Sequence, residues 1–289
     1  MKRLRIWHRT VYRYAREVAF GSHRLVFRPR DSHDLRIVNT KLVIKPAATL
    51  RWQHDAFGNS VAVATFTERA SELEFESTLE VEHYGLDGHL AMERANAWWP
   101  WPYEAHEEKD LKIPSTPQMP DPEGHIEAWA RGFLWPPTGG TPARELLGGM
   151  VNSIQQMKYT QREGEGVQSP CETLTRREGT CRDFAMLMME GCRRLGMAAH
   201  FVSGYLYDPK LDVDDPEDSG TTHAWMAVYV PGAGWLEIDP TNGLFAGDTL
   251  VRVAVARDPA QVAPLSGTFS GEREDFLGMD VKVSVRLIS

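Results

Sequence analysis

A helix that begins with a cysteine is predicted by residues 177–185, which read Arg177-Glu178-Gly179-Thr180-Cys181-Arg182-Asp183-Phe184-Ala185. Thr180 is a suitable N-cap, and Asp183 stands three residues later, where a capping box has its second member. The apolar residues that follow recur at helical spacing and form one stripe: Phe184, Leu187, Met188, Cys192 and Leu195. Arg193 and Arg194 then suit the last helical turn, and Gly196 predicts the helix end.

The thiol of Cys181 would lie at the positive end of this helix's dipole, which stabilises a thiolate over a thiol. A thiolate is the form in which cysteine acts as a nucleophile. An isolated intracellular cysteine is more often a small core residue, so the nucleophile hypothesis depends on partners elsewhere in the chain. A base and an orienting acceptor are the partners that such a nucleophile needs.

Both partners are offered by a predicted hairpin. Residues 222–230 and 235–239 read as two strands around the turn Pro231-Gly232-Ala233-Gly234. His223 lies in the first strand and Asp239 ends the second, 16 positions later. A three-residue loop pairs Val230 with Gly234 and puts both side chains on one face, whereas a four-residue loop pairs Val230 with Trp235 and puts them on opposite faces. A Cys-His-Asp site therefore requires the three-residue loop or a bulge.

Three runs in this order resemble the core of the transglutaminase-like superfamily, and in particular its bacterial branch of cysteine proteases. They are Gly179-Thr180-Cys181-Arg182-Asp183-Phe184-Ala185, His223-Ala224-Trp225, and Asp239-Pro240-Thr241-Asn242-Gly243. The beginning of the chain, with Arg28-Pro29 and Asp55-Ala56-Phe57-Gly58-Asn59, is similar to the N-terminal β-domain of that branch. One departure is Ala227, where the family usually carries an acidic residue.

The resemblance implies an α+β fold, in which a papain-like, transglutaminase-like core follows an N-terminal antiparallel β-sandwich. It also implies a catalytic triad of Cys181, His223 and Asp239. The oxyanion would be bound by the Cys181 backbone N–H and a second donor, for which Tyr159 is a candidate. Trp225 is a further candidate contact with the oxyanion or substrate.

The implied reaction is acyl transfer through a thioester on a peptide or isopeptide amide. Hydrolysis, as by a protease or amidase, is the first expectation, and transfer to an amine is the second. A catalytically idle binding module of the same fold is the alternative from another class. The implied partner is a peptide or protein substrate, with no cofactor and no metal. A zinc site of Cys171, Cys181, Cys192 and a histidine is another alternative, but spacings of ten and eleven residues suit tetrahedral zinc poorly.

Composition restricts the class of protein. The 289 residues carry a net charge of −8 without a basic cluster, which argues against a nucleic-acid surface. No apolar run approaches the roughly 20 residues of a membrane span, and the basic first residues lack the apolar run of a signal peptide. Three cysteines without CxxC spacing argue against a disulfide framework. We therefore expect a cytoplasmic protein with neither nucleic acid nor membrane as a partner.

Patterning along the chain predicts four parts. Alternating strands indicate a β-sandwich over 1–95, and prolines indicate an extended linker over 96–124. The catalytic core would span 125–250, and 251–289 would be a C-terminal extension whose final strand packs back on the body. We expect the scattered histidines of the first part to be surface or strand-pairing residues: His8, His23, His33, His54 and His83. The acidic segment 208–218 does not match an EF-hand and reads as a solvated loop, with weak cation binding as the alternative.

Overall fold

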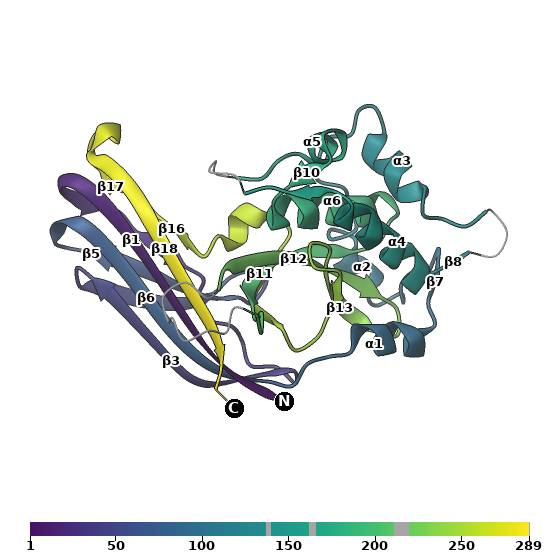
Figure 1. Ribbon diagram of the computed structural model, residues 1–289, viewed down its shortest axis with the longest axis horizontal. Helices are drawn as coiled ribbons and strands as arrows, with labels where there is room; N and C mark the ends of the chain where they lie inside the picture. Colours follow the sequence, from purple (N-terminus) through teal and green to yellow (C-terminus); the bar gives the residue numbers. More distant parts are fainter. Residues whose placement is uncertain (137–139, 162–165, 211–219, 289) are drawn as a thin grey trace.

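The computed structural model describes residues 1–136, 140–161, 166–210 and 220–288. Its first part is a sandwich of two antiparallel sheets, drawn on the left of Figure 1. One sheet has the order β17 (Phe269–Ser270), β1 (Lys2–Phe20), β6 (Arg69–His83) and β3 (Leu35–Lys45), and β18 (Phe276–Leu287) also pairs with β1. The other has the order β16 (Leu265–Ser266), β2 (His23–Leu25), β5 (Ser60–Phe66) and β4 (Ala48–His54). The predicted N-terminal antiparallel domain is confirmed.

The sandwich core is built from side chains that alternate along these strands. An antiparallel strand with one buried face needs such a period of two. The buried apolar residues come from both sheets and include Tyr14, Val18, Phe20, Leu25, Ala62, Ala64, Leu73 and Phe75. Because the two sheets contribute to one cluster, neither buries its apolar face without the other.

The C-terminal residues complete this sandwich. Strand β18 pairs antiparallel with β1 from Leu4↔Leu287 to Tyr14↔Phe276, so the two chain ends lie side by side (Figure 1). Strands β16 and β17 add to β2 and β1. The sandwich therefore extends beyond the predicted range 1–95. Strand β18 is the expected final strand that packs back on the body; local patterning identifies strands but not their distant partners, so its pairing with β1 could not be named.

Residues 96–124 form more structure than the predicted extended linker. Strand β7 (Trp98–Trp99) pairs with β8 (Thr141–Pro142), and α2 (Glu108–Leu111) forms one turn of helix. Pro142 caps α4 (Ala143–Gln155), while the Thr141 hydroxyl accepts a hydrogen bond from the Trp135 N–H at 2.8 Å.

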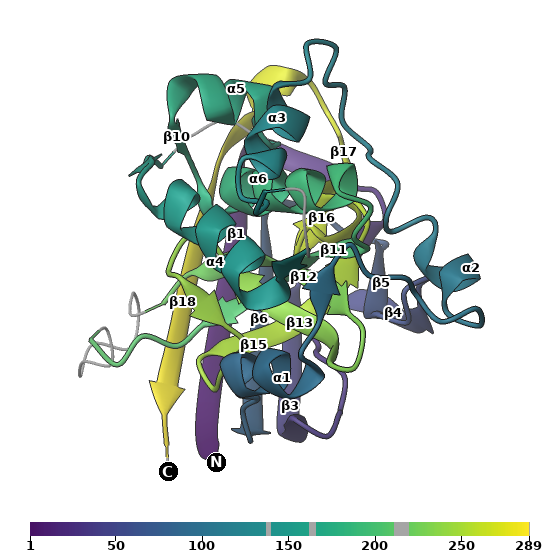
Figure 2. The same cartoon turned by 90° about the vertical axis from the view of Figure 1, so that its right-hand side faces the viewer.

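The second part is a five-stranded antiparallel sheet with helices. The sheet has the order β14 (Leu244–Phe245), β13 (Gly234–Asp239), β12 (Thr222–Val230), β11 (Ala199–Leu206) and β15 (Leu250–Ala256). Four helices gather on one side of it: α3 (His125–Arg131), α4, α5 (Pro170–Arg176) and α6 (Cys181–Arg194) (Figures 1 and 2), and α1 (Gly88–Ala95) packs against α4. The predicted core boundary after residue 250 falls inside β15, whose pairing with β11 makes it part of this sheet.

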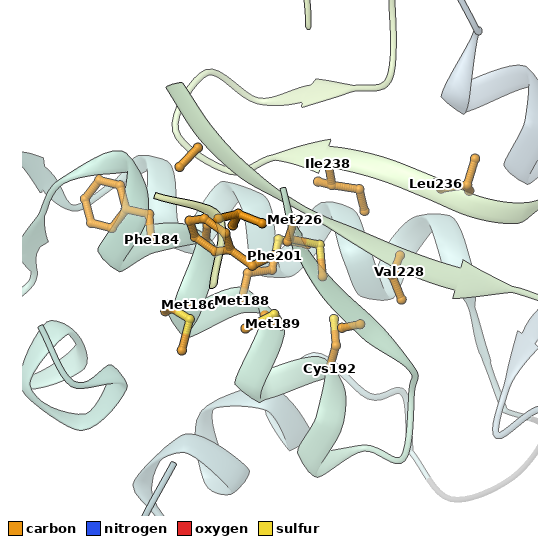
Figure 3. Close-up of a cluster of buried hydrophobic side chains, with 14 of the residues drawn as sticks. Phe184, Met186, Met188, Met189, Cys192, Phe201, Met226, Val228, Leu236 and Ile238 are labelled. Carbon is orange, nitrogen blue, oxygen red and sulfur yellow. The ribbon is translucent and has the colours of Figure 1, made fainter. Parts of the chain in front are cut away.

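Helix α6 runs through the centre of this second part. Its predicted stripe packs on β11, β12 and β13, with Phe184, Met188 and Cys192 near Phe201, Met226 and Val228 (Figure 3). Burial does not stop at the stripe, because every residue from Asp183 to Arg193 is buried. On the other side, a Cβ on Gly191 would lie 2.6 Å from Trp129 and 2.8 Å from Met150. A helix enclosed on all sides is a rigid support for its first residue, Cys181.

The end of α6 is locked in two ways. Met197 N–H donates to Cys192 O and Gly196 N–H to Arg193 O, both at 2.9 Å, which is a Schellman motif around the positive φ of Gly196. Arg193 and Glu190 form an ion pair at 2.7 Å whose side chains are both 0% exposed. Arg193 lies in the last turn of α6 as predicted. Its side chain is buried there and donates hydrogen bonds to the carbonyls of Pro114, Ala199 and Arg257.

Three of the five scattered histidines, His8, His23 and His83, are buried in paired strands, so they are strand-pairing rather than surface residues. His8 Nδ1 lies 2.9 Å from the Tyr205 hydroxyl of β11 and joins the sandwich to the second part. His83 Nε2 bonds the Leu250 carbonyl at 2.9 Å, and His23 bonds the carbonyl of Gly21. Burial lowers the pKa of His8 to about 4. His33 and His54 are exposed.

Of the helices in the described ranges, none has the length and apolar composition of a membrane span.

Candidate active site

Cys181 is the first residue of α6, and the predicted capping box is confirmed. Thr180 Oγ1 accepts the Asp183 N–H at 3.4 Å, and Asp183 Oδ2 accepts the Thr180 N–H at 2.9 Å. The other carboxylate oxygen of Asp183 accepts the Gln168 N–H at 2.6 Å, so this buried side chain also holds the preceding loop. Cys181 is partly exposed at the helix start. The positive end of the dipole and access from solvent therefore coincide at its thiol.

Tyr159 reaches Cys181 from a neighbouring strand. Strand β9 (Lys158–Tyr159) pairs parallel with β10 (Glu178–Gly179), and Tyr159 comes opposite Gly179. Its phenol is half-exposed and is in hydrogen-bonding contact with the Cys181 side chain. Burial and the negative charge of Cys181 raise the pKa of Tyr159, so the phenol keeps its proton and can donate. The predicted candidate donor is thus next to the thiol.

The β12–β13 hairpin has the three-residue loop that a Cys-His-Asp site requires. Val230 pairs with Gly234, and the register continues to Met226 opposite Ile238. One further step places Asp239 opposite Trp225 and diagonal to His223, on the same face. His223 Nε2 lies 2.7 Å from Asp239 Oδ2. The residues are 7% and 0% exposed, so this contact is shielded from water.

Asp239 is oriented by the turn that follows it. Its Oδ1 accepts the N–H groups of Thr241 at 2.9 Å and Asn242 at 3.3 Å, and its Oδ2 accepts Asn242 Nδ2 at 2.7 Å. Burial opposes ionisation of this carboxyl, but the bonds from His223 and Asn242 outweigh it and lower the pKa of Asp239. Sequence reasoning gave no role to Asn242. The signal for it was present, because an Asp-Pro-Thr-Asn-Gly turn brings an amide back to its first carboxylate.

His223 is held between Asp239 and Cys181. With Nε2 on Asp239, Nδ1 is the ring nitrogen left for the thiol. Burial works against the charged ring, but hydrogen bonds and opposite charges from Asp239 and Cys181 outweigh it and raise the pKa of His223. His223 is therefore placed to exchange a proton with Cys181 while Asp239 stabilises its charged form.

Trp225 does not serve as the predicted oxyanion or substrate contact. Its side chain is 0% exposed, and its indole N–H is already donated to Glu237 Oε2 at 2.7 Å. The ring stacks against His223 instead, with centroids 5.8 Å apart and planes 28° apart. The sequence placed Trp225 on the correct face of the strand, but burial of that face depends on elements distant in the chain.

Comparisons with known proteins give the family of this chain. A family model for the bacterial transglutaminase-like N-terminal region matches residues 4–82, and one for the transglutaminase-like superfamily matches residues 141–240. Uncharacterized protein Rv2569c of Mycobacterium tuberculosis is 32% identical over 98% of this chain and 92% of its own length. The chain belongs to the transglutaminase-like superfamily. A Mycobacterium leprae relative, Uncharacterized protein ML0607, is 34% identical over 40% of this chain and 41% of its own length.

The transglutaminase-like fold is also found in a solved structure. A crystal structure from Cytophaga hutchinsonii, described as a "Putative Cysteine Protease", superposes with a TM-score of 0.71 at 18% identity. The match covers 98% of this chain and 90% of that one. The likeness therefore includes the sandwich as well as the core, and the predicted fold class is confirmed.

The other two cysteines of this transglutaminase-like chain lie apart from the site. Cys192 is 0% exposed in the core, and burial raises its pKa to about 12. Cys171 lies in α5, and burial and Asp121 raise its pKa. Within the described ranges, no three His, Cys, Asp or Glu side chains form a group suited to a metal ion, so the three cysteines do not form the alternative zinc site. Most of the acidic segment 208–218 lies outside the described residues.

Proposed function

We propose that this protein is a cysteine-dependent acyl-transfer enzyme that acts on peptide or isopeptide amide bonds. The observation that carries the proposal is the 2.7 Å contact between His223 and Asp239, with Cys181 on the other side of the imidazole at a helix N-terminus. Each group has the chemistry that its position requires. A nucleophile, a base and a group that orients the base are the three parts of thiol catalysis.

In the first half of the reaction, the Cys181 thiolate attacks the amide carbonyl. The carbon–sulfur bond forms, and the oxyanion is stabilised by the Cys181 backbone N–H, which as an initial helix N–H has no partner within the helix. The Tyr159 phenol is the proposed second donor. When the carbon–nitrogen bond breaks, the His223 imidazolium gives its proton to the departing amine. A thioester on Cys181 and a neutral His223 remain.

In the second half, His223 removes a proton from water, which attacks the thioester carbonyl. The carbon–sulfur bond breaks and the acid product leaves. The thiolate–imidazolium pair is thereby restored. Asp239 holds His223 in the required tautomer through both halves. Hydrolysis is our first choice, and attack by an amine on the same thioester is the second. Membership of the transglutaminase-like superfamily keeps amine transfer as a candidate.

The test is incubation with a library of peptide and isopeptide amides, with and without an added primary amine, followed by mass analysis. Hydrolysis adds one water to the substrate, whereas transfer replaces the leaving amine with the added one. A thioester adduct on the Cys181 peptide that is absent from the Cys181→Ala variant supports both. Lack of any adduct or product from every substrate would instead favour the idle binding module.

A further inference from the structure

Trp225 supports the face of His223 that the triad does not use. Trp225 lies two residues after His223 on the same face of β12, and the two rings stack. The indole itself is tightly enclosed, because a Cβ on Gly204 would lie 2.6 Å from its ring. Gly204 pairs with His223 across β11 and β12. Any change in the position of the indole would therefore be transmitted to the imidazole.

The indole is fixed at its nitrogen by Glu237 of β13. Trp225 Nε1 donates to Glu237 Oε2 at 2.7 Å, and Glu237 Oε1 accepts a charged hydrogen bond from Arg252 of β15. Arg252 Nη2 also lies 3.3 Å from Asp34 Oδ1, in the sandwich. The result is a chain of contacts, Asp34–Arg252–Glu237–Trp225–His223, that begins in the N-terminal domain and ends at the candidate active site.

The charges in this chain depend on one another. The side chains of Asp34 and Glu237 are only 10% and 12% exposed, so each needs the guanidinium that they share. Burial opposes ionisation of Asp34, but bonds from Ser32 and Arg252 outweigh it and lower the pKa of Asp34. A carboxylate that lost Arg252 here would take up a proton or move toward water. Either event would loosen the Trp225 indole.

We propose that Asp34, Arg252 and Glu237 are positioning residues, which hold the Trp225 indole and through it the His223 imidazole. The inference rests on the proposed function, because it concerns the geometry of the same base. It gives the N-terminal domain a role in the reaction without a catalytic residue of its own. None of the three residues is in contact with Cys181 or Asp239 in the described part of the chain.

The strand register supplies a specific test. Ala227 is directly opposite Glu237 in the β12–β13 ladder, on the same face as Trp225. Side chains directly opposite in such a ladder start from points about 5 Å apart. A carboxylate moved from 237 to 227 can therefore still reach between the indole and Arg252. The double variant Ala227→Glu/Glu237→Ala moves the group without removing it.

The experiment measures the alkylation rate of Cys181 by iodoacetamide across a pH series, together with thermal unfolding. We expect Glu237→Ala to lower the rate at about pH 6 by roughly 10- to 100-fold, the size of effect known for metal-binding histidines that lose the group orienting them. The pH dependence of the alkylation rate should shift in the same variant. Glu237→Gln keeps an acceptor for the indole and should lie between Glu237→Ala and wild type. The double variant should recover most of the rate.

Two further variants and two controls complete the design. Asp34→Asn and Arg252→Met should slow the reaction in the same direction, and they test the chain if Glu237→Ala does not fold. Glu74→Ala removes an equally buried sandwich carboxylate, paired with Arg9 and Lys45, and should leave the rate unchanged. If His223→Ala leaves the profile unchanged, the proposed function itself fails. The positioning inference alone is overturned if His223→Ala shifts the pH profile of alkylation but Glu237→Ala does not. It is also overturned if the double variant folds but does not recover the alkylation rate.

Discussion

The imidazole Nε2 of His223 lies 2.7 Å from Asp239 Oδ2, at the open end of a hairpin whose pairing begins at Val230 and Gly234. The three-residue loop decides this contact, because one more loop residue would turn one of the two side chains to the opposite face. The same hairpin carries Trp225 and Glu237, which hold the imidazole from its other side. The loop thus positions four side chains together.

We first predict that iodoacetamide labels Cys181 well before the other two cysteines at about pH 6. Cys192 is 0% exposed with a pKa raised to about 12, and the pKa of Cys171 is raised by burial and Asp121. His223→Ala should slow the labelling of Cys181 sharply, since the thiolate loses its cationic partner. Peptide mass analysis over time measures all three rates. Labelling of Cys171 or Cys192 as fast as Cys181 in the native protein would contradict the thiolate argument.

The second prediction concerns stability against pH. Because the pKa of Asp239 is lowered in the folded state, its stabilising effect is present above the unfolded value of about 4 and is lost as pH falls through the folded value. The raised pKa of His223 has the opposite sign: its effect is present below about pH 6.5 and is lost as pH rises toward the folded value. The stability difference between wild type and Asp239→Asn should therefore be largest between about pH 4 and 6.5. Urea unfolding at a series of pH values measures it, and a difference that grows steadily above that window would refute the pairing.

A third prediction concerns the space beside Trp225. In Gly204→Ala, the new Cβ would lie 2.1 Å from the Val251 carbonyl oxygen and 2.6 Å from the indole. We expect a loss of about 1–3 kcal/mol in the free energy of unfolding, as for other overpacked sites, and slower alkylation of Cys181. Gly148→Ala in α4 is the control, because nothing beyond its chain neighbours and the backbone of its own helix lies within 4 Å of its Cβ position. It should be neutral or stabilising by up to about 1 kcal/mol. Equal stabilities for the two variants would argue against a tight indole site.

The fourth prediction tests the clamp at the end of α6. Glu190→Gln leaves the 0%-exposed Arg193 guanidinium without its carboxylate and should cost about 3–5 kcal/mol of stability. Glu127→Gln removes a helical Glu–Arg pair whose side chains are about half exposed, and it should cost about 0.5 kcal/mol or less. Chemical denaturation of both variants measures the difference. Comparable losses would show that burial of the Glu190–Arg193 pair has no special weight.

Local physical chemistry explains which parts of the site could be predicted. The start of α6, its capping box and its glycine end depend on residues within a few positions of one another. All three could therefore be predicted from the sequence. The three-residue loop could be named only as one of two options, because both loop lengths suit Pro231-Gly232-Ala233-Gly234 equally well. Asn242 was within reach of the same local reasoning, since its contacts to Asp239 close a turn.

Burial and long-range pairing account for what could not be predicted. Trp225, Arg193 and His8 carry side chains that suit a surface or a ligand as well as a core, and distant elements placed all three inside. The chain Asp34–Arg252–Glu237 joins residues up to 218 positions apart. By itself, the sequence determined the order of nucleophile, base and acceptor, because capping and hairpin formation are local. Only the tertiary structure decided which strand edge receives β18, which face of β12 is closed and what supports His223, because these depend on the surfaces that remain when all elements have packed.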